Sequence, residues 1–361
     1  MNFFKKLTGR VLYGIAVLLG VVTLIFFLFN VLPGDPARMM LGQRADMSSL
    51  EGIRKELGLD KPLYLQYIRY LNDLSPVSIH NSDNNESYFF LDPEKYATSK
   101  TVVATSGGIC MVVKLPWLGR SFQSRKPVSE MISEAFPNTM VLALAAILIA
   151  FFAGTLLGTF SALKKDSWYD RGTLLFSALG MSVPSFFAAI LIAWFFAYKL
   201  GHITHLNLTG NIYEIDDFGR GIKLELKNLI LPAITLGIRP LSVVVQLSRN
   251  SMLEVLNQDY IRTAYAKGLK KSRVIGVHAL RNSLNPVVTA ISGWFASMLA
   301  GVVFVEYIFG WRGLGYMLVN ALNFYDLPVV LGCVLTTSVV FVIVNISMDI
   351  IYAMLDPRIR K

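Results

Sequence analysis

Charged residues are scarce in this chain, and they are unevenly spread along it. Only 16% of the 361 residues are Asp, Glu, Lys or Arg, whereas 54% are hydrophobic. Soluble globular proteins carry about 25% charged residues. The composition therefore argues against an ordinary soluble domain and predicts an integral membrane protein.

Cysteine and histidine are also rare, with two and four copies in the whole chain. Cys110 and Cys333 are far apart in sequence, so they indicate neither a disulfide framework nor a zinc site. His202 and His205 form an HxxH pattern, but two histidines without a third ligand are more typical of polar residues at a membrane interface. No metal site is predicted.

Catalytic motifs are absent from the sequence. There is no GxxxxGK(S/T) phosphate-binding loop, no HExxH zinc motif and no GxSxG nucleophile motif,. No pair of acidic residues lies inside an apolar stretch, as an ion-coupled transporter would be expected to have. The sequence therefore predicts neither an enzyme nor a chain that binds a cofactor itself.

Long apolar segments are what the chain does contain. A helix needs about 20 mainly apolar residues to cross a bilayer, and six segments meet this requirement: residues 11–31, 138–163, 173–198, 229–247, 284–305 and 327–348. The first is longer than the apolar core of a signal peptide, about 7–15 residues, so we expect it to be retained. The predicted fold class is an all-α integral membrane protein with six transmembrane helices.

The basic residues indicate how these helices are oriented. Lys and Arg cluster in residues 5–10, 164–171, 249–281 and 358–361, which all fall on one side of a six-helix topology. Basic residues in short loops mark the cytoplasmic side, so both termini are predicted to be cytoplasmic. The net charge of +10 is explained by this orientation, without a nucleic acid partner.

The chain divides into four predicted regions. Residues 1–31 hold the cytoplasmic N-terminus and first helix, and residues 32–137 form an extracytoplasmic region. Residues 138–355 form a five-helix core that includes a cytoplasmic loop at 249–283, and residues 356–361 are a cytoplasmic tail. Within 32–137 we expect two amphipathic helices, the first capped by Ser48 or Ser49 and ended by Gly58, then a polar loop and strand-like runs around a Gly-Gly turn.

The stretch "DYIRTAYAKGLKKSRVIGVHALRN", residues 259–282, is polar and basic although apolar segments flank it. Its pattern predicts one helix ended by Gly268 and a second begun by Ser272. Small residues at Ala264, Ala266 and Gly268 would let another protein approach closely. An amphipathic pair that only binds anionic lipid is the alternative, and periodicity does not separate the two.

The same stretch resembles the cytoplasmic loop of permease subunits of bacterial ABC importers, in particular the dipeptide/oligopeptide branch. The blocks "LPGDPA", "LGLDKPLYLQYIRYL", "GRSF", "PVSEMISEAFPNTMVLALAA", "SVPSFF", "VEYIFGWRGLGYMLVNALNFYDLPVV" and "MDIIYAMLDPRIR" resemble the family in the same order. The resemblance therefore covers most of the chain.

This resemblance implies a multi-pass protein of the bacterial inner membrane that imports di- or oligopeptides. It implies a second homologous permease subunit, two ATP-binding subunits that use ATP and Mg, and an extracytoplasmic substrate-binding protein as partners. It also implies that the first helix of the loop docks on an ATP-binding subunit, with Gly268 at the turn and Ala264 and Ala266 in close packing. The remaining docking residues implied in this way are Asp259, Tyr260, Ile261, Arg262 and Leu269.

Two alternatives for the function stay open at this point. Related permeases carry nickel or other small solutes, and an ion-coupled secondary transporter would belong to a different class. The sequence also departs from the family pattern, with Tyr265 where arginine is common and with an insertion at about residues 75–115. Arg239 lies inside the fourth apolar segment, where it could face the translocation path and meet a peptide carboxylate, and Asn345 is a second candidate for that path.

Overall fold

The structure is a computed structural model that describes residues 2–31, 46–57, 59–84, 87–93, 95–96, 100–105, 108–215 and 221–355. The "LPGDPA" block, Gly58 and the tail at 356–361 lie outside these residues. The chain forms two compact units, each described by itself. Unit 1 comprises Met1–Ala16, Glu134–Val319 and Thr336–Lys361, and unit 2 comprises Val17–Ser133 and Asn320–Leu335.

The described part of the chain is mostly helical, and every predicted apolar segment is helical, the third with a break at residues 183–184. Over the residues that the structure describes, four helices are long and apolar enough to cross a membrane: α1 Asn2–Val31, α5 Val128–Leu163, α9 Lys227–Leu256 and α14 Leu327–Leu355. Two bent helix pairs bring the number to six if each pair is counted as one crossing. The exact number of crossings and the sides on which the loops and termini lie stay predictions.

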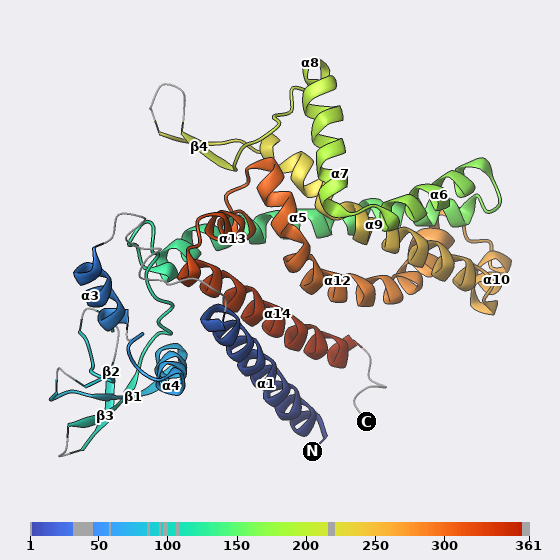
Figure 1. Cartoon of the computed structure of the whole chain (residues 1–361). Helices are drawn as coiled ribbons and strands as arrows, with labels where there is room; N and C mark the ends of the chain where they lie inside the picture. Colours follow the sequence, from blue (N-terminus) through green and yellow to red (C-terminus); the bar gives the residue numbers. More distant parts are fainter. Residues whose placement is uncertain are drawn as a thin grey trace. The chain divides into compact units, whose positions relative to one another are not determined.

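The third apolar segment is not one straight helix. It is divided into α6 Trp168–Ser182, α7 Ser185–Ile192 and the π-helical turns η1 Ala193–Lys199, with a bend of 114° between α6 and the α7–η1 part. Pro184 precedes α7 with φ −61° and ψ 139°, an extended conformation that ends a helix. Figure 1 shows α7 turning steeply away from α6.

The second bent pair lies at the C-terminal end of α12 Leu280–Phe309, which is followed by α13 Leu314–Asn323. The bend between them is 80°. Gly310 ends α12 in the left-handed region, at φ +64°, where glycine carries no side-chain penalty.

The helices of unit 1 pack closely through small residues. The helix α9 contacts both α6 and α12, and α7 contacts α9 and α12. A side chain at Gly158 would collide with the carbonyl of Val245, and one at Gly237 would lie 3.0 Å from the carbonyl oxygen of Ala146. These glycines let α5 and α9 approach backbone to backbone.

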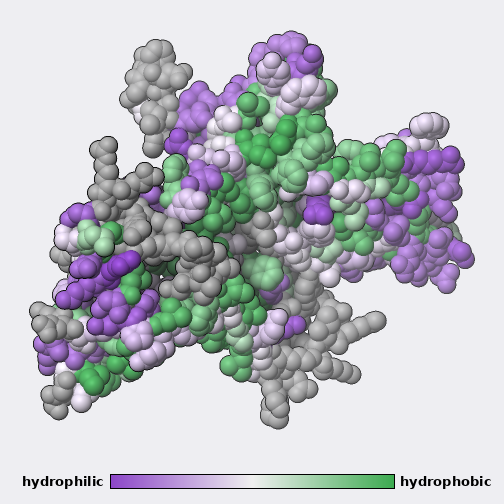
Figure 2. Space-filling view, viewed as in Figure 1, coloured by the Kyte–Doolittle hydropathy of each residue, from purple (hydrophilic) through white to green (hydrophobic). Residues whose placement is uncertain are grey.

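The surface of unit 1 changes character along its helices. Figure 2 shows a hydrophobic surface over α6 and α7 and a hydrophilic one at the end of the unit that carries α10 Asp259–Ala266. Large apolar side chains stay exposed on α5, among them Leu144, Leu148, Phe152 and Leu156. Such a face is typical of a helix that contacts lipid or another membrane subunit.

Unit 2 contains the strands of the predicted extracytoplasmic region. The strands β1 Val77–Asn81, β2 Lys100–Ala104 and β3 Ile109–Val113 form an antiparallel sheet in the order β1-β3-β2. The strand-like runs around the Gly-Gly turn are therefore confirmed. The strand β1 was not predicted, since the residues after Ser75 were interpreted as a polar loop.

Two short helices complete unit 2: α3 Met47–Leu57 and α4 Leu63–Leu74. Ser48 and Ser49 lie inside α3, so the prediction that one of them caps the helix is wrong. The aromatic face of α4 packs on α1, where the Phe26 ring lies 5.1 Å from that of Tyr67 and 5.5 Å from that of Tyr70.

Candidate functional site

The polar stretch between α9 and α12 folds as a short helix, α10 Asp259–Ala266, closed by a glycine. Gly268 has φ +74°, and its backbone N–H donates to the Tyr265 carbonyl at 2.9 Å. The next N–H, of Leu269, donates to the Ala264 carbonyl at 3.3 Å. The position therefore favours glycine for its left-handed backbone, and the predicted end of the helix is confirmed.

One face of α10 is buried against its own chain. Ile261 is 1% exposed and Ala264 is 7% exposed. They belong to a hydrophobic cluster with Met252 of α9 and with Val274 and Ala279 of the segment that leads into α12. These two side chains, which the resemblance placed among the partner-docking residues, are thus used to anchor α10.

The opposite face of α10 is open. The side chains of Asp259 and Arg262 are 96% and 75% exposed, and their charged groups lie 3.6 Å apart. Tyr260 and Tyr265 are also exposed, and the Tyr260 hydroxyl accepts a hydrogen bond from the Asn282 amide at 3.0 Å. Ala266 and Gly268 are exposed and Leu269 is half-buried, so most of the predicted docking residues lie where a partner can reach them.

The chain after α10 continues directly into the fifth apolar segment. The short helix α11 Lys271–Arg273 is followed by the π-helical turns η2 Val274–Ala279 and then by α12. Lys270 precedes α11, and no side chain caps it, so the prediction that Ser272 begins the second helix is wrong. Because α10 packs on η2, it is connected to α12 by both packing and chain.

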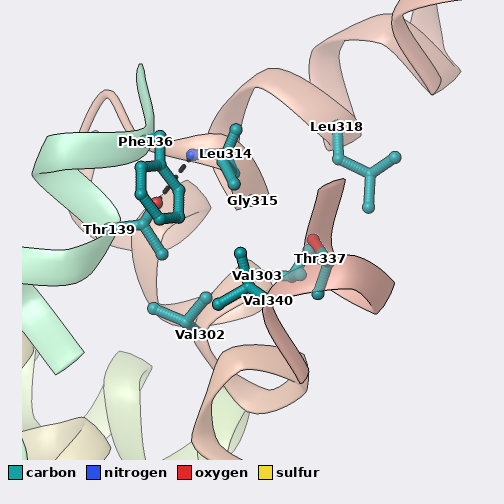
Figure 3. Close-up of a pocket in the computed structure, with 9 residues that line it drawn as sticks. All are labelled: Phe136, Thr139, Val302, Val303, Leu314, Gly315, Leu318, Thr337 and Val340. Atoms are coloured by element: carbon teal, nitrogen blue, oxygen red, sulfur yellow. Dashed lines mark hydrogen bonds between the residues drawn. The ribbon is translucent and has the colours of Figure 1, made fainter. Parts of the chain in front are cut away.

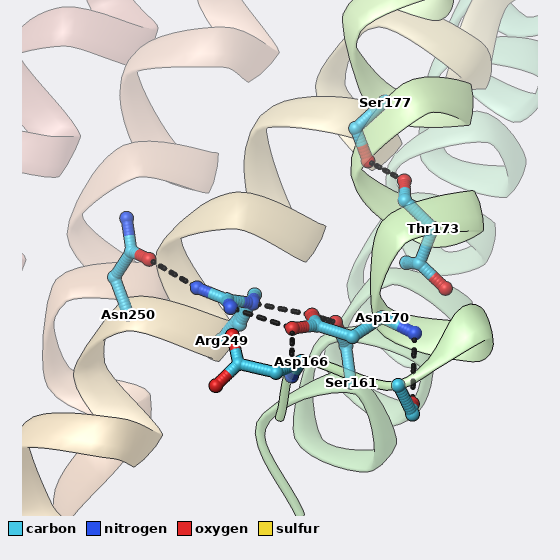
Figure 4. A network of polar contacts seen from close by, with 8 residues as sticks. Ser161, Asp166, Asp170, Thr173, Ser177, Arg249 and Asn250 are labelled. Atoms are coloured by element: carbon cyan, nitrogen blue, oxygen red, sulfur yellow. Dashed lines mark hydrogen bonds and ion pairs between the residues drawn. The ribbon is translucent and has the colours of Figure 1, made fainter. Parts of the chain in front are cut away.

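A buried ion pair joins the ends of α6 and α9 (Figure 4). Asp170 is 1% exposed, and its two carboxylate oxygens accept from Arg249 Nε at 2.6 Å and from an Arg249 terminal nitrogen at 2.7 Å. The hydroxyl of Ser161 and the backbone N–H of Asp166 also donate to this carboxylate. Four donors from α5, the following turn and α9 therefore converge on one acid.

This pair was not predicted from the sequence, which places its two charges 79 residues apart. The available indication was their location, because Asp170 and Arg249 both border apolar segments at the end predicted to be cytoplasmic. The two charges meet only because α6 packs against α9. The sequence pattern does not predict that packing, so it does not predict the ion pair.

A second buried carboxylate, Glu306, organises the bend between α12 and α13. It is 0% exposed and accepts hydrogen bonds from the Thr139 hydroxyl at 2.7 Å and from the N–H groups of Gly315 at 2.7 Å and Tyr316 at 3.2 Å. The Thr139 oxygen in turn accepts from the Leu314 N–H at 2.8 Å. Glu306 and Thr139 therefore cap the N-terminus of α13.

The surroundings of this cap are tightly filled. Figure 3 shows Thr139 bonded to Leu314 beside a cavity of about 20 Å³, room for about one water molecule. A side chain at Gly315 would collide with the backbone of Val303 and lie 3.0 Å from a Glu306 oxygen. The Trp311 ring nitrogen also donates to the Asn138 carbonyl at 2.9 Å, which attaches the bend to α5 a second time.

Arg239 borders a cavity of about 70 Å³ in unit 1, next to the α6–α7 bend. Its wall comes from α6, α7, α9 and α12 and includes Ser185, Thr235, Trp294 and Ser297. Within the described residues, Arg239 forms no ion pair. A partnerless cation on a membrane helix is expensive unless it meets water or an anion.

Asn345, the other predicted path residue, does not line the Arg239 cavity. Its amide donates to the Phe341 carbonyl of its own helix at 2.9 Å. The structure therefore does not bring the two candidates together in one cavity. Among the described residues, no group of three His, Cys, Asp or Glu side chains is arranged to hold a metal ion.

Comparison with known proteins identifies the family of the chain. Residues 154–361 match the family described as binding-protein-dependent transport system inner membrane component, and residues 3–84 match the N-terminal part of such membrane components. The chain belongs to this family. It is a permease component, a multi-pass protein of the inner membrane, and the predicted family and localisation are confirmed.

Individual relatives resemble the permease along almost its whole length. A dipeptide transport system permease protein of Alkalihalophilus pseudofirmus is 32% identical over 97% of this chain and 98% of its own. A di/tripeptide transport system permease protein of Pseudomonas aeruginosa is 35% identical over 94% of both chains. A glutathione transport system permease protein of Salmonella paratyphi A is 31% identical over 100% of this chain and 99% of its own.

Two pairs of family-like sequence blocks of the permease meet in the structure. Thr139, from the "PVSEMISEAFPNTMVLALAA" block, bonds to Glu306 of the "VEYIFGWRGLGYM" block. In unit 2, the hydroxyl of Ser121 and the N–H of Phe122, both in "GRSF", donate to the carboxylate of Asp326 in "NFYDLP". In each case a buried carboxylate, Glu306 or Asp326, accepts hydrogen bonds from the other block of the pair.

Proposed function

We propose that this permease component imports short peptides as one subunit of an ATP-driven transporter, and that α10 is the element on which an ATP-binding subunit acts. The observation that carries the proposal is the two-sided structure of α10. Ile261 and Ala264 anchor it to α9 and η2, whereas Asp259, Arg262 and Tyr265 stay exposed on the other face. A helix anchored on one face can transmit a movement applied to the other.

The remaining subunits follow from the same proposal. The sequence contains no phosphate-binding loop, so ATP and Mg would be used by two separate ATP-binding subunits, and this chain would bind no cofactor. A second homologous permease would complete the path, and an extracytoplasmic binding protein would deliver the peptide.

Movement of α10 would reach the membrane helices through packed contacts. Its buried face touches Met252 near the end of α9 and Val274 before α12. The Asp170–Arg249 pair connects that end of α9 to α6. Because packed interiors are dense and resist compression, these three helix ends would move together, as in other rigid-body transport switches.

The peptide would pass the cavity beside Arg239. The guanidinium group has no anionic partner among the described residues, and the neighbouring Ser185, Thr235 and Ser297 are polar. A free peptide carboxylate would supply the missing charge. The names of the relatives, which specify dipeptides, di/tripeptides and glutathione, support this substrate class.

The decisive test is a pair of substitutions at Gly268 in the assembled transporter reconstituted in vesicles. Asn and Asp both tolerate a left-handed backbone, so Gly268→Asn and Gly268→Asp differ in charge at nearly equal size. We expect Gly268→Asn to retain most dialanine uptake and Gly268→Asp to lower uptake by about tenfold or more, since a buried like-charge or unpaired charge at an interface costs several kcal/mol.

The measurement is dialanine accumulation together with ATP hydrolysis in the same vesicles. Equal uptake by the two variants would contradict docking at α10. Accumulation of nickel but not of dialanine by the unaltered transporter would contradict the peptide assignment.

A further inference from the structure

Unit 2 contains a cleft that neither the proposed coupling nor the proposed membrane path uses. Its volume is about 290 Å³, near the lower end of small-molecule sites, about 300–1,000 Å³. It lies between the α3–α4 segment and β1 with the residues that follow β1. Aromatic side chains line one part of it: Tyr88, Phe89, Phe90 and Tyr96.

The bottom of the cleft is a connected polar network. The Asp73 carboxylate accepts from Lys95 Nζ at 2.7 Å and from the Tyr96 hydroxyl. The Lys114 ammonium donates to the Asp73 carbonyl at 2.5 Å and lies 5.0 Å from the centroid of the Tyr96 ring. Two lysines thus share one aspartate, which leaves a surplus of positive charge here.

The other two carboxylates that line the cleft, Asp60 and Asp92, also have hydrogen-bond or ion-pair partners. Asp60 pairs with Lys61 at 3.1 Å, and Asp92 accepts from the Lys95 backbone N–H at 3.4 Å. His80 is 2% exposed, and its pKa is lowered by burial and by the charge of Lys114. Among the cleft residues that the structure describes, no acidic group is therefore left to neutralise a further cation.

Two cations in the cleft, Lys55 and Arg69, have no acidic partner in the part of the chain that the structure describes. Within the described residues, neither Lys55 nor Arg69 lies within ion-pair distance of a carboxylate. The guanidinium carbon of Arg69 lies 4.6 Å from the centroid of the Tyr88 ring. Stacking on an aromatic ring holds the guanidinium plane. One donor also bonds to Tyr88, and a guanidinium has five N–H donors, so the others can reach a carboxylate.

We propose that this cleft binds a small organic carboxylate, the free C-terminal carboxylate of a short peptide, through Arg69 and Lys55. The carboxylate chemistry follows from the unpaired cations, and the aromatic wall suits an apolar side chain. The volume limits the ligand to roughly the size of a dipeptide. That the carboxylate belongs to a peptide rests on the proposed function, whereas the site itself does not.

The test is calorimetric titration of the purified full-length chain in phosphatidylcholine nanodiscs. The probes are dialanine, dialanine amide and inorganic phosphate. We expect dialanine to bind and its amide, which lacks the carboxylate, to bind at least about tenfold more weakly, because truncating one partner of a charge pair costs more than the 1.4 kcal/mol that tenfold represents. Equal binding of the amide, phosphate binding as tight as that of dialanine, or no binding of dialanine would each overturn the proposal.

Variants locate the site within the chain. Arg69→Gln and Lys55→Gln should each weaken dialanine binding by about tenfold or more, whereas Lys100→Gln on the exposed strand β2 should leave it unchanged. Loss of binding in Arg239→Gln together with retention in Arg69→Gln would overturn the assignment. Slow thiol labelling of Cys110, which is 2% exposed in β3, checks that each variant of unit 2 is folded.

Dialanine uptake by the assembled transporter tests the proposed function separately. Uptake without binding to the isolated chain would refute the cleft and leave peptide transport intact. Binding that depends on Arg69, in a transporter that does not accumulate dialanine, would refute peptide transport and leave the cleft intact.

Discussion

Asp170 and Glu306 are both almost completely buried, but they are stabilised in different ways. Asp170 receives a guanidinium, a hydroxyl and a backbone N–H. Glu306 receives one hydroxyl and two backbone N–H groups, and no cation pairs with it within the described residues. Asp170 joins α6 to α9 through an ion pair. Glu306 stabilises the bend between α12 and α13 through hydrogen bonds from neutral donors.

This difference in hydrogen-bond partners predicts how much stability a substitution at each site should cost. Removing one member of a buried ion pair leaves the other charge without compensation, which costs about 3–5 kcal/mol. Removing the charge of a carboxylate that is held by neutral donors leaves donors unpaired, which costs about 1–3 kcal/mol. The ion pair should therefore be the more sensitive site, although both side chains are almost inaccessible to solvent.

The largest effect is expected for Arg249→Met. This change leaves the Asp170 carboxylate buried with only the Ser161 and Asp166 donors, and it should lower the free energy of unfolding by about 3–5 kcal/mol. Thermal unfolding of the purified chain in detergent would measure the loss. The double variant Asp170→Asn/Arg249→Met contains no buried charge at this position and should recover part of the stability, so equal loss in both variants would argue against the ion pair.

A smaller effect is expected for Glu306→Gln. The side-chain oxygen of glutamine can still accept from Gly315 or Tyr316, but its NH₂ group cannot replace the second acceptor. We expect a loss of about 1–3 kcal/mol in the same unfolding measurement and lower transport, because the N-terminus of α13 is no longer fixed. Thr139→Ser keeps the hydroxyl and serves as the control, and a loss in Glu306→Gln larger than that of Arg249→Met would reverse the comparison.

The smallest effect concerns Lys114, a buried charge in unit 2, outside the membrane-spanning helices. Burial lowers its pKa to about 8, so between pH 8 and 10 the unfolded chain holds a proton that the folded chain has released. Stability should therefore rise by about 1–2 kcal/mol over this range. Lys114→Met should remove most of the rise in thermal unfolding curves, with a remainder from Lys95, whose pKa is also lowered by burial. A parallel rise in parent and variant would assign it to another group.

Much of the fold follows from local sequence. The apolar segments are long enough to predict helices without any knowledge of their neighbours, and Gly268 marks the end of α10 because a left-handed backbone favours glycine. The runs on either side of the Gly-Gly turn likewise predict β2 and β3. Each of these features depends on residues adjacent in the chain.

The site was only partly predictable for the same reason. The pattern of α10 identifies an amphipathic helix, but it does not say whether Ile261 and Ala264 face a partner or their own chain. That depends on Met252, Val274 and Ala279, which approach them only when α9 and η2 are in place. Pro184 explains a break in the helix, but the 114° bend also depends on tertiary packing, because α7 packs against α9 and α12.

By itself, the sequence determined the membrane class, the family and the position of the polar stretch that becomes α10. These depend on composition, segment length and residue order, which are properties of the chain before it folds. Only the tertiary structure decided which charges are paired and which are left open. Asp170 meets Arg249, whereas Arg69 and Lys55 meet no acid among the described residues. Folding decides such pairings between groups that are distant in sequence, and a linear pattern does not encode those distances.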